Sequence, residues 1–279
     1  MVNNSVTLVT WLHVLVWRTT SLAKTVSIVG LEGFPMVKAG DNVAELIVAV
    51  AEKENVPFDD GDIVVVGHKI VSKAEGRTMR LKEVKPSSRA KELSKLTLRD
   101  PRLVELVLRE AKRVVKATKE ILIVENRSGF VCVNAGIDKS NVEGEDAYVL
   151  LPADPDKSAR EIHSQIRKLT GKNVAVVICD TYSRPFRRGQ VEFAIGVAGM
   201  KLFRDYRGKK DLVGYVMQVK NSAIADEIAS AAELLMGQGN EGIPAVIVKG
   251  LNAAKMTEDT SVSELIMSKQ EDLFTGTLT

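Results

Sequence analysis

Long apolar runs without polar alternation are the most regular feature of the sequence. Val174–Cys179 reads VAVVIC, and Gly61–Gly67 reads GDIVVVG. A continuous run of Val and Ile is typical of a strand that is buried on both faces. We therefore predict strands at Thr25–Gly30, Gly61–Gly67, Glu120–Val124, Phe130–Asn134, Asp146–Leu151, Val174–Cys179, Tyr215–Val219 and Ala245–Val248. The polar turn Glu125–Gly129 suggests that the third and fourth of these form a hairpin.

Apolar residues at helical spacing lie between these strands. After Asp41 or Asn42, either of which can cap a helix, apolar residues recur on one face from Val43 to Val50. A capping box at Ser261–Glu264 predicts the start of a last helix. Between these two we predict helices at Ser87–Thr97, at Asp100–Thr118, from Pro152 to about Thr170 with Gly171 as the C-terminal stop, and at Ala223–Met236.

The bulk composition is that of an enzyme-sized globular protein. The chain has 279 residues, which predicts one large domain or two intertwined ones, and its 45% apolar content is ample for a core. Lys and Arg total 39 against 36 Asp and Glu, so a general nucleic-acid binder is not indicated. Basic clusters at Arg184–Arg188 and Lys209–Lys210 fit a small anionic ligand better. The second cluster lies in the charged loop Asp205–Gly214, which is a lid or, more simply, a solvent-facing connector.

The cysteines and histidines do not form a metal-binding or catalytic pattern. Cys132 and Cys179 both lie in apolar runs without metal-ligand spacing, which favours buried free thiols in a reducing cytoplasm over a disulfide. His13, His68 and His163 are scattered, so neither a zinc site nor a histidine-based triad is indicated. His163 lies in a polar helical segment, and we expect it to be solvated.

The N-terminus differs in composition from the rest of the chain. Val6–Trp17 is apolar but too short for a membrane span, and no basic region precedes it. It is a weak signal-like segment or, as we prefer, part of an extension over residues 1–23 that does not belong to the fold. The domain is then expected to begin near Lys24 and to contain no membrane segment.

The segment Ile178–Gly189, which reads ICDTYSRPFRRG, carries the densest candidate chemistry. Asp180 and Thr181 follow a buried strand, at the edge where open α/β sheets usually bind ligands. A carboxylate and a hydroxyl suit a hard divalent cation, and arginines suit phosphate or carboxylate oxygens. The candidates are Arg184, Arg187 and Arg188. The segment is equally typical of a capped turn with a solvated basic surface, so alone it leaves both interpretations open.

A second carboxylate stands at a strand end. The sequence from Val133 to Asn141 reads VNAGIDKSN, in which Asp138, Ser140 and Asn141 offer oxygen ligands and Gly136 permits a tight turn. An Asx-type turn is the simpler interpretation of this segment when it is considered alone.

Two further segments suit phosphate binding. Lys69 and Lys73 follow the predicted strand Gly61–Gly67, and lysine commonly meets phosphate as a point charge, although a solvated loop is the simpler alternative. The run Gly237–Pro244, GQGNEGIP, is glycine-rich but follows a helix, so it is not a Rossmann fingerprint. No P-loop motif is present either.

Together and in this order, six segments closely resemble the coenzyme F420-0:L-glutamate ligase family. They are GLEGFPMVKAGDN, SKAEGR, VNAGIDKSN, DTYSRPFRRGQVEFAIGVAG, ADEIASAAELLMGQGNEGIPAV and KGL, within about Val26 to Leu251. The resemblance implies a mixed α+β fold with mixed sheets and flanking helices, unlike Rossmann and P-loop folds. It also implies an intertwined two-domain protomer, formed by residues 24–279, and a homodimer.

The resemblance assigns roles to individual positions. Metal ligands are expected at Asp138, Asp180, Thr181 and Gln238, and catalytic roles at Asp138, Asp180 and Lys73. The nucleotide is expected at Phe34, Pro35, Met36, Val37, His68, Lys69, Lys73, Asn141, Met236, Gly237, Gln238, Gly239, Asn240, Glu241, Gly242 and Ile243. Two positions depart from the family pattern. His68–Lys69 stand where many relatives have small hydroxyl residues, and Gln238 stands where some have a glutamate.

The activity that the resemblance implies is a GTP-dependent γ-glutamyl ligase. GTP would phosphorylate the carboxylate of coenzyme F420-0, and the amino group of L-glutamate would attack the acyl phosphate, giving GDP and phosphate. The implied cofactors are Mg²⁺ or Mn²⁺, with K⁺ as a further candidate. From the residues themselves we expect Arg184, Arg187 and Arg188 to hold the anionic groups of a substrate. The alternatives are a metal-dependent phosphotransferase or nucleotidyltransferase and a non-catalytic GTP- or flavin-binding module.

Overall fold

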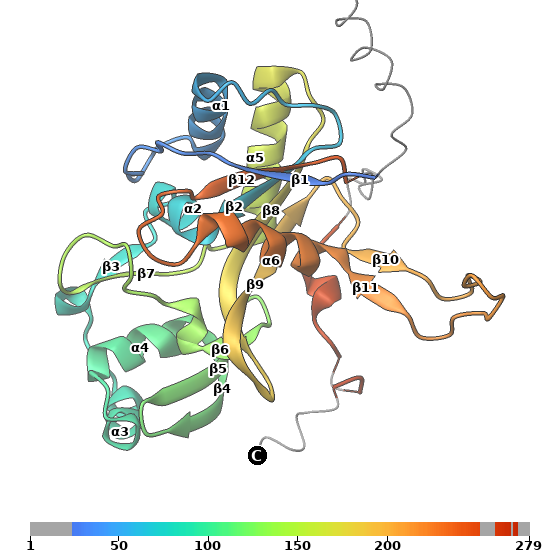
Figure 1. The fold of residues 1–279 in the computed structure, drawn as a ribbon. Coiled ribbons are helices and arrows are strands. Elements are labelled where there is room, and N and C mark those ends of the chain that lie inside the picture. Colours follow the sequence, from blue (N-terminus) through green and yellow to red (C-terminus); the bar gives the residue numbers. More distant parts are fainter. Residues whose placement is uncertain (1–23, 252–259, 269, 273–279) are drawn as a thin grey trace, which may run out of the picture.

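A five-stranded mixed sheet forms the centre of the computed structural model, which describes residues 24–251, 260–268 and 270–272 (Figure 1). The strand order is β1-β12-β2-β8-β9, with β2 and β8 parallel and the other neighbours antiparallel. The strands are β1 (Ser27–Gly30), β2 (Ile63–Gly67), β8 (Ala175–Arg184), β9 (Arg187–Ala198) and β12 (Ala245–Lys249). Four of the predicted strands are thereby confirmed.

Helices cover both faces of this sheet, as the unbroken apolar runs require. One face of the sheet packs against α1 (Val43–Lys53) and α5 (Pro155–Thr170), and the other packs against α6 (Ile224–Met236). Asn42 caps α1, because its side chain accepts hydrogen bonds from the backbone N–H groups of residues 44 and 45. Gly171 ends α5 in a left-handed conformation, as predicted.

A second layer has a core of its own, beside the central sheet. Helices α3 (Ser88–Thr97) and α4 (Pro101–Glu110) pack on an antiparallel sheet of β4 (Ala111–Thr118), β5 (Ile121–Asn126) and β6 (Val131–Val133). A short α2 (His68–Ala74) and the pair β3 (Thr78–Arg80) and β7 (Ala147–Val149) connect the two layers. Mixed sheets with flanking helices are thus confirmed, whereas the division into two subdomains stays a prediction.

The prediction of one helix over Asp100–Thr118 is wrong in its second half. The helix ends at Glu110, and the remaining eight residues form β4. Apolar spacing alone cannot distinguish the two, and the antiparallel pairing with β5 decides for the strand.

The strand predicted at Tyr215–Val219 is also wrong. The residues between β10 (Phe203–Asp205) and β11 (Asn221–Ala223) form an arm that projects from the body and contains only the isolated bridge Lys210–Val216 (Figure 1). Leu212 and Val213 are almost fully exposed near its tip.

Smaller predictions have mixed outcomes. Cys132 and Cys179 are buried free thiols, as expected. His163 is partly buried rather than solvated, because its Nδ1 lies 2.6 Å from the carbonyl oxygen of Val174. The capping box at Ser261 is present, but it begins a 3-10 helix, Val262–Leu265. The extension over residues 1–23 lies outside the described residues, among which no helix is long and apolar enough to cross a membrane.

Candidate active site

A cavity of about 600 Å³ opens where β2 ends and β8 continues beyond it. Gly67, the last residue of β2, pairs with Cys179, so Asp180 and Thr181 lie just past the shared edge. Ligands of α/β sheets commonly bind at such carboxyl ends of parallel strands. The remaining walls come from the loop after β1, the start of α2, the loop around Asn141 and the loop after α6.

The segments that the sequence singles out converge on this cavity. Its lining includes Phe34, Pro35, Met36, Val37, His68, Lys69, Lys73, Asn141 and the whole run from Met236 to Ile243. Asp180 and Thr181 also line the cavity, whereas Asp138 contacts the lining residue Lys69. Residues from five separate parts of the chain therefore share one site, although their individual roles stay predictions.

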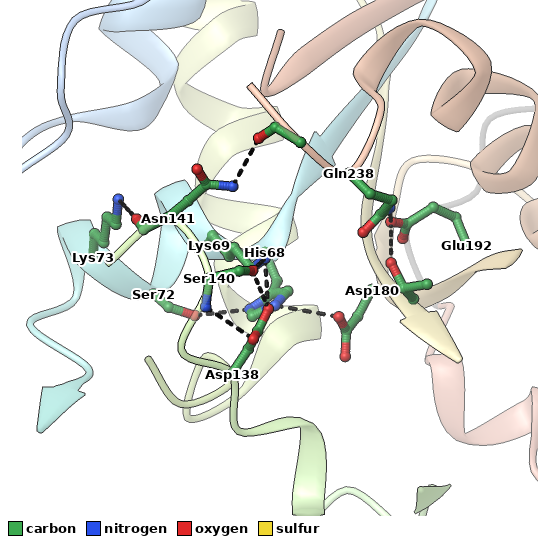
Figure 2. Close-up of polar contacts among 12 residues, drawn as sticks. His68, Lys69, Ser72, Lys73, Asp138, Ser140, Asn141, Asp180, Glu192 and Gln238 are labelled. Carbon is green, nitrogen blue, oxygen red and sulfur yellow. Dashed lines mark hydrogen bonds and ion pairs between the residues drawn. The ribbon is translucent and has the colours of Figure 1, made fainter. Parts of the chain in front are cut away.

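Lys69 binds the first of the two predicted metal carboxylates. Its Nζ lies 2.7 Å from Oδ2 of Asp138 and donates to Oγ of Ser140 at 2.6 Å (Figure 2). Burial alone would raise the pKa of Asp138, but hydrogen bonds from Lys69 and Ser140 outweigh it and lower the pKa to about 2. Asp138 is thus an anion throughout the physiological range, with a cation already beside it.

Lys73 and Asn141 close another side of the cavity. Lys73 Nζ donates to the backbone oxygen of Asn141 at 2.7 Å, and Asn141 Nδ2 donates to the carbonyl oxygen of Gly239 at 3.2 Å. Burial lowers the pKa of Lys73, the charge of Glu143 opposes this change, and the charge of Lys69 adds to it. Two ammonium groups on one helix therefore face a site that suits an anionic ligand.

The glycine-rich loop after α6 owes its shape to a missing side chain. Gly237 has a φ of +60°, and a Cβ there would lie 2.2 Å from the carboxyl carbon of Glu241. The Glu241 carboxylate folds back and accepts a hydrogen bond from the Gly239 N–H at 2.8 Å. Glycine is required at position 237 because any Cβ would displace the Glu241 carboxylate from this hydrogen bond.

Asp180 faces His68 on one side of β8. His68 Nε2 lies 3.3 Å from Oδ1 of Asp180, and Nδ1 lies 3.3 Å from Oγ of Ser72. The side chains of His68 and Asp180 are only 3% and 14% exposed. The imidazole is therefore close enough to form an ion pair with the second predicted metal carboxylate when it is protonated, although Nε2 makes no hydrogen bond of normal geometry among the described residues.

Glu192 of β9 anchors the other side of β8. Its Oε1 accepts hydrogen bonds from Thr181 Oγ1 at 2.8 Å and from Gln238 Nε2 at 3.1 Å (Figure 2). Burial raises the pKa of Glu192, and the nearby charge of Asp180 raises it further. Two predicted metal ligands are thus oriented by a third acidic residue.

The residues at the cavity fit a hard divalent cation. Carboxylate, hydroxyl and amide oxygens are the ligands that Mg²⁺ and Mn²⁺ prefer, and the ammonium of Lys69 on Asp138 marks a position that attracts positive charge. Among the described residues, no group of three or more His, Cys, Asp and Glu side chains is gathered closely enough to hold an ion by itself. Neutral oxygens and phosphate oxygens of a bound nucleotide would have to complete the coordination.

Comparison with known proteins identifies the family. A sequence profile of the F420-0:gamma-glutamyl ligase family matches residues 33–250. The chain belongs to this family. The coenzyme F420:L-glutamate ligase of Archaeoglobus fulgidus is 47% identical over 248 residues, covering 89% of this chain and 96% of its own. The ligase of the same name from Methanothermobacter thermautotrophicus is 43% identical, covering 90% of this chain and 99% of its own.

In this F420-0:gamma-glutamyl ligase family member, the three candidate arginines lie away from the cavity lining. Arg184 ends β8, and Arg187 and Arg188 begin β9, so all three flank the turn at the end of a long hairpin beside the second layer (Figure 1). The side chain of Arg184 is oriented across this turn, because it donates to the backbone oxygen of Arg188 at 3.4 Å. Their contact with a substrate stays a prediction, and it requires a substrate that extends from the cavity along this hairpin.

Sequence reasoning missed Glu192 in this ligase. The one available signal was an acidic residue within the otherwise apolar end of β9, VEFAIGVA. Its place opposite Thr181 follows only from the register of β8 and β9, which the sequence pattern does not give.

Proposed function

We propose that the protein is a GTP-dependent γ-glutamyl ligase that joins L-glutamate to the carboxylate of coenzyme F420-0. The names of the family and its relatives support coenzyme F420-0 and glutamate as substrates, whereas GTP is proposed from the resemblance of the nucleotide segments. One observation carries the proposal: the same cavity is lined by the predicted nucleotide segments and by Asp180 and Thr181. A phosphotransferase or a passive binding module has no comparable support from the family match.

The chemistry demands an activated carboxyl group, because a carboxylate is a poor electrophile. The acceptor carboxylate oxygen attacks the γ-phosphorus of GTP, giving an acyl phosphate and GDP. The glutamate nitrogen then attacks the acyl carbon and loses a proton, and phosphate leaves with the former carboxylate oxygen. Divalent cations, when bound, neutralise charge on the phosphate oxygens during such a transfer.

The residues of the cavity have distinct parts in this scheme. Asp138 and Asp180, with Thr181 and Gln238, would hold the divalent cations. Lys73 lies half-buried in the wall and would pair with a phosphate oxygen. The glycine-rich loop held by Glu241 lines the cavity, and its glycines would allow a nucleotide to approach the backbone closely.

The acceptor and the second substrate would lie toward the β8–β9 hairpin. Its arginines are predicted anion-binding side chains, and Asp180 and Thr181 of the cavity lie on the same strand pair that leads to them. We propose that Arg184, Arg187 and Arg188 hold anionic groups of the deazaflavin substrate or of glutamate.

We also propose that the ligase is a homodimer. The arm between β10 and β11 leaves Leu212, Val213, Tyr215 and Val219 exposed, a concentration of apolar side chains that is unfavourable in water. A second copy of the chain is the occupant that the family resemblance implies.

A product assay tests the activity. The protein is incubated with GTP, L-glutamate, coenzyme F420-0 and Mg²⁺ or Mn²⁺, and the products are analysed by mass spectrometry. The proposal expects a deazaflavin product heavier by one or more glutamyl residues, formation of GDP and loss of both upon chelation. Phosphate release without a glutamylated product would favour a phosphotransferase.

A further inference from the structure

The environment of Glu192 is unusual for a structural residue. The side chain is only 5% exposed, yet none of the described residues pairs with it as a cation. Its Oε1 accepts two hydrogen bonds, whereas Oε2 is buried and accepts no hydrogen bond of normal geometry from the described residues, although the buried thiol of Cys179 interacts with the carboxylate. A buried carboxylate with an unsatisfied oxygen is costly, so its retention in the wall of a cavity requires an explanation.

The two neighbours of Glu192 are oriented so that their own acceptor oxygens remain available. Thr181 donates its single hydroxyl proton to Glu192, so the lone pairs of Oγ1 remain available to bind a cation or accept a hydrogen bond. Gln238 gives an Nε2 proton to the same carboxylate oxygen, so its Oε1 lies on the other side of the amide. All three side chains line the cavity. Apart from the second N–H of Gln238 Nε2, their remaining hydrogen-bonding capacity is that of acceptors, which suits a cation.

This acceptor group is separate from the Asp138–Asp180 pair. Thr181 lies opposite Glu192 in the antiparallel register, whereas Asp180 lies opposite Phe193. Because successive residues of a strand point to opposite faces, Asp180 is directed toward His68 and away from Glu192 (Figure 2). The two groups of oxygen ligands thus flank β8 from its two faces.

We propose that Glu192 is a direct ligand of a second divalent cation, bound through Oε2 together with Thr181 Oγ1 and Gln238 Oε1. The inference rests on the proposed function, which requires divalent cations at this cavity. Thr181 and Gln238 are neutral, so without Glu192 this half of the site would lack any negative protein charge. Glu192 supplies it, and the cation in turn satisfies the orphaned Oε2.

The ligand role and a structural role give opposite stability changes. If Glu192 served only as a hydrogen-bond acceptor for the fold, Glu192→Gln would destabilise the protein and leave cation binding unchanged. If it is a ligand, the amide removes a buried charge, so the metal-free variant should melt at the wild-type temperature or above it, with cation binding weakened. Glu227→Gln, an exposed position on α6, is the matched control for loss of one acidic charge.

The experiment counts Mn²⁺ bound per chain at saturating GDP, by loss of the free-ion electron paramagnetic resonance signal against a GDP-only blank. We expect two ions for the wild type and for Glu227→Gln, and a second ion bound at least about tenfold more weakly by Glu192→Gln. Retention of both ions at wild-type affinity by a folded Glu192→Gln protein would overturn the inference.

A wild-type crystal with Mn²⁺ and GDP provides a test that does not depend on folding of the variant. An anomalous peak within coordination distance of Glu192 Oε2 supports the inference, and peaks at Asp138 and Asp180 alone refute it. If wild-type protein neither binds Mn²⁺ nor forms the glutamylated product, the proposed function fails as well. If it forms the product while Glu192→Gln retains both ions, only the present inference fails.

Discussion

The ion pair between Lys69 and Asp138 predicts that this ligase resists metal binding until a nucleotide arrives. The ammonium lies 2.7 Å from the carboxylate oxygen and lies where a cation would have to bind. A metal ion entering alone must displace it, whereas a nucleotide offers Lys69 a phosphate as a new partner. Lys69→Met, which keeps the length of the side chain and removes its charge, should therefore tighten binding of Mn²⁺ alone and weaken binding of GDP.

The size of the change in Mn²⁺ affinity can be estimated from the pKa of Asp138. Lowering the pKa of Asp138 from its ordinary 3.8 to about 2 corresponds to roughly 2.4 kcal/mol. Ser140 causes part of this shift and 42% of the Asp138 side chain is exposed, so the share of Lys69 is at most about 1 kcal/mol, or approximately a fivefold change in affinity. Isothermal titration with Mn²⁺, in the absence of nucleotide, measures it.

The neighbouring exposed Lys139 provides the control. Lys139→Met removes one positive charge next to Asp138, so it accounts for any long-range electrostatic effect. If Lys69→Met binds Mn²⁺ no more tightly than Lys139→Met does, the ammonium does not compete with the metal, and the reasoning is refuted.

Three further predictions concern the pH dependence of this ion pair, the β8–β9 hairpin and the exposed arm. Because the pKa of Asp138 is low, its ion pair stabilises the fold above pH 3.8, and this stabilisation is lost as the pH falls toward 2. The free energies of urea unfolding of wild type and Lys69→Met should therefore converge near pH 2 and differ by at most about 1 kcal/mol above pH 4. Equal stability of wild type and Lys69→Met at all pH values would contradict a stabilising role of this ion pair. Arg187→Ala should raise the KM for the deazaflavin or for glutamate at least about tenfold, with an unchanged melting temperature, as steady-state kinetics would reveal; an unchanged KM for both would remove this arginine from the site. Leu212→Asp should shift the protein from dimer to monomer in light scattering, whereas Leu96→Asp, at an exposed position on α3, should not.

The sequence predicts the central sheet well because each of these strands is marked by a short apolar run of its own residues. The runs of Val and Ile in β2, β8 and β12 need two covered faces, and the caps at Asn42 and Gly171 define helix ends through bonds within a few residues. The strand β4 was missed for the opposite reason. Its residues satisfy a helical pattern, and only pairing with β5 makes them extended.

The candidate site divides in the same way. Asp138, Asp180 and the glycine-rich loop stand out within short segments, and the family resemblance relates them to one another. Glu192 is recognised by its burial, by its hydrogen bond with Gln238 in the loop after α6, and by its place opposite Thr181 in the β8–β9 register. None of these features can be inferred from the sequence of β9 alone. The opposing orientation of Asp180 and Thr181 likewise becomes meaningful only when their partners are known.

The measurement that tests the central claim most directly follows one oxygen atom. Coenzyme F420-0 labelled with ¹⁸O in its carboxylate is converted with GTP and L-glutamate, and the released phosphate is analysed by mass spectrometry. If the carboxylate is phosphorylated before amide formation, each phosphate carries one oxygen from the labelled carboxylate. Unlabelled phosphate, released together with a glutamylated product, would contradict the account.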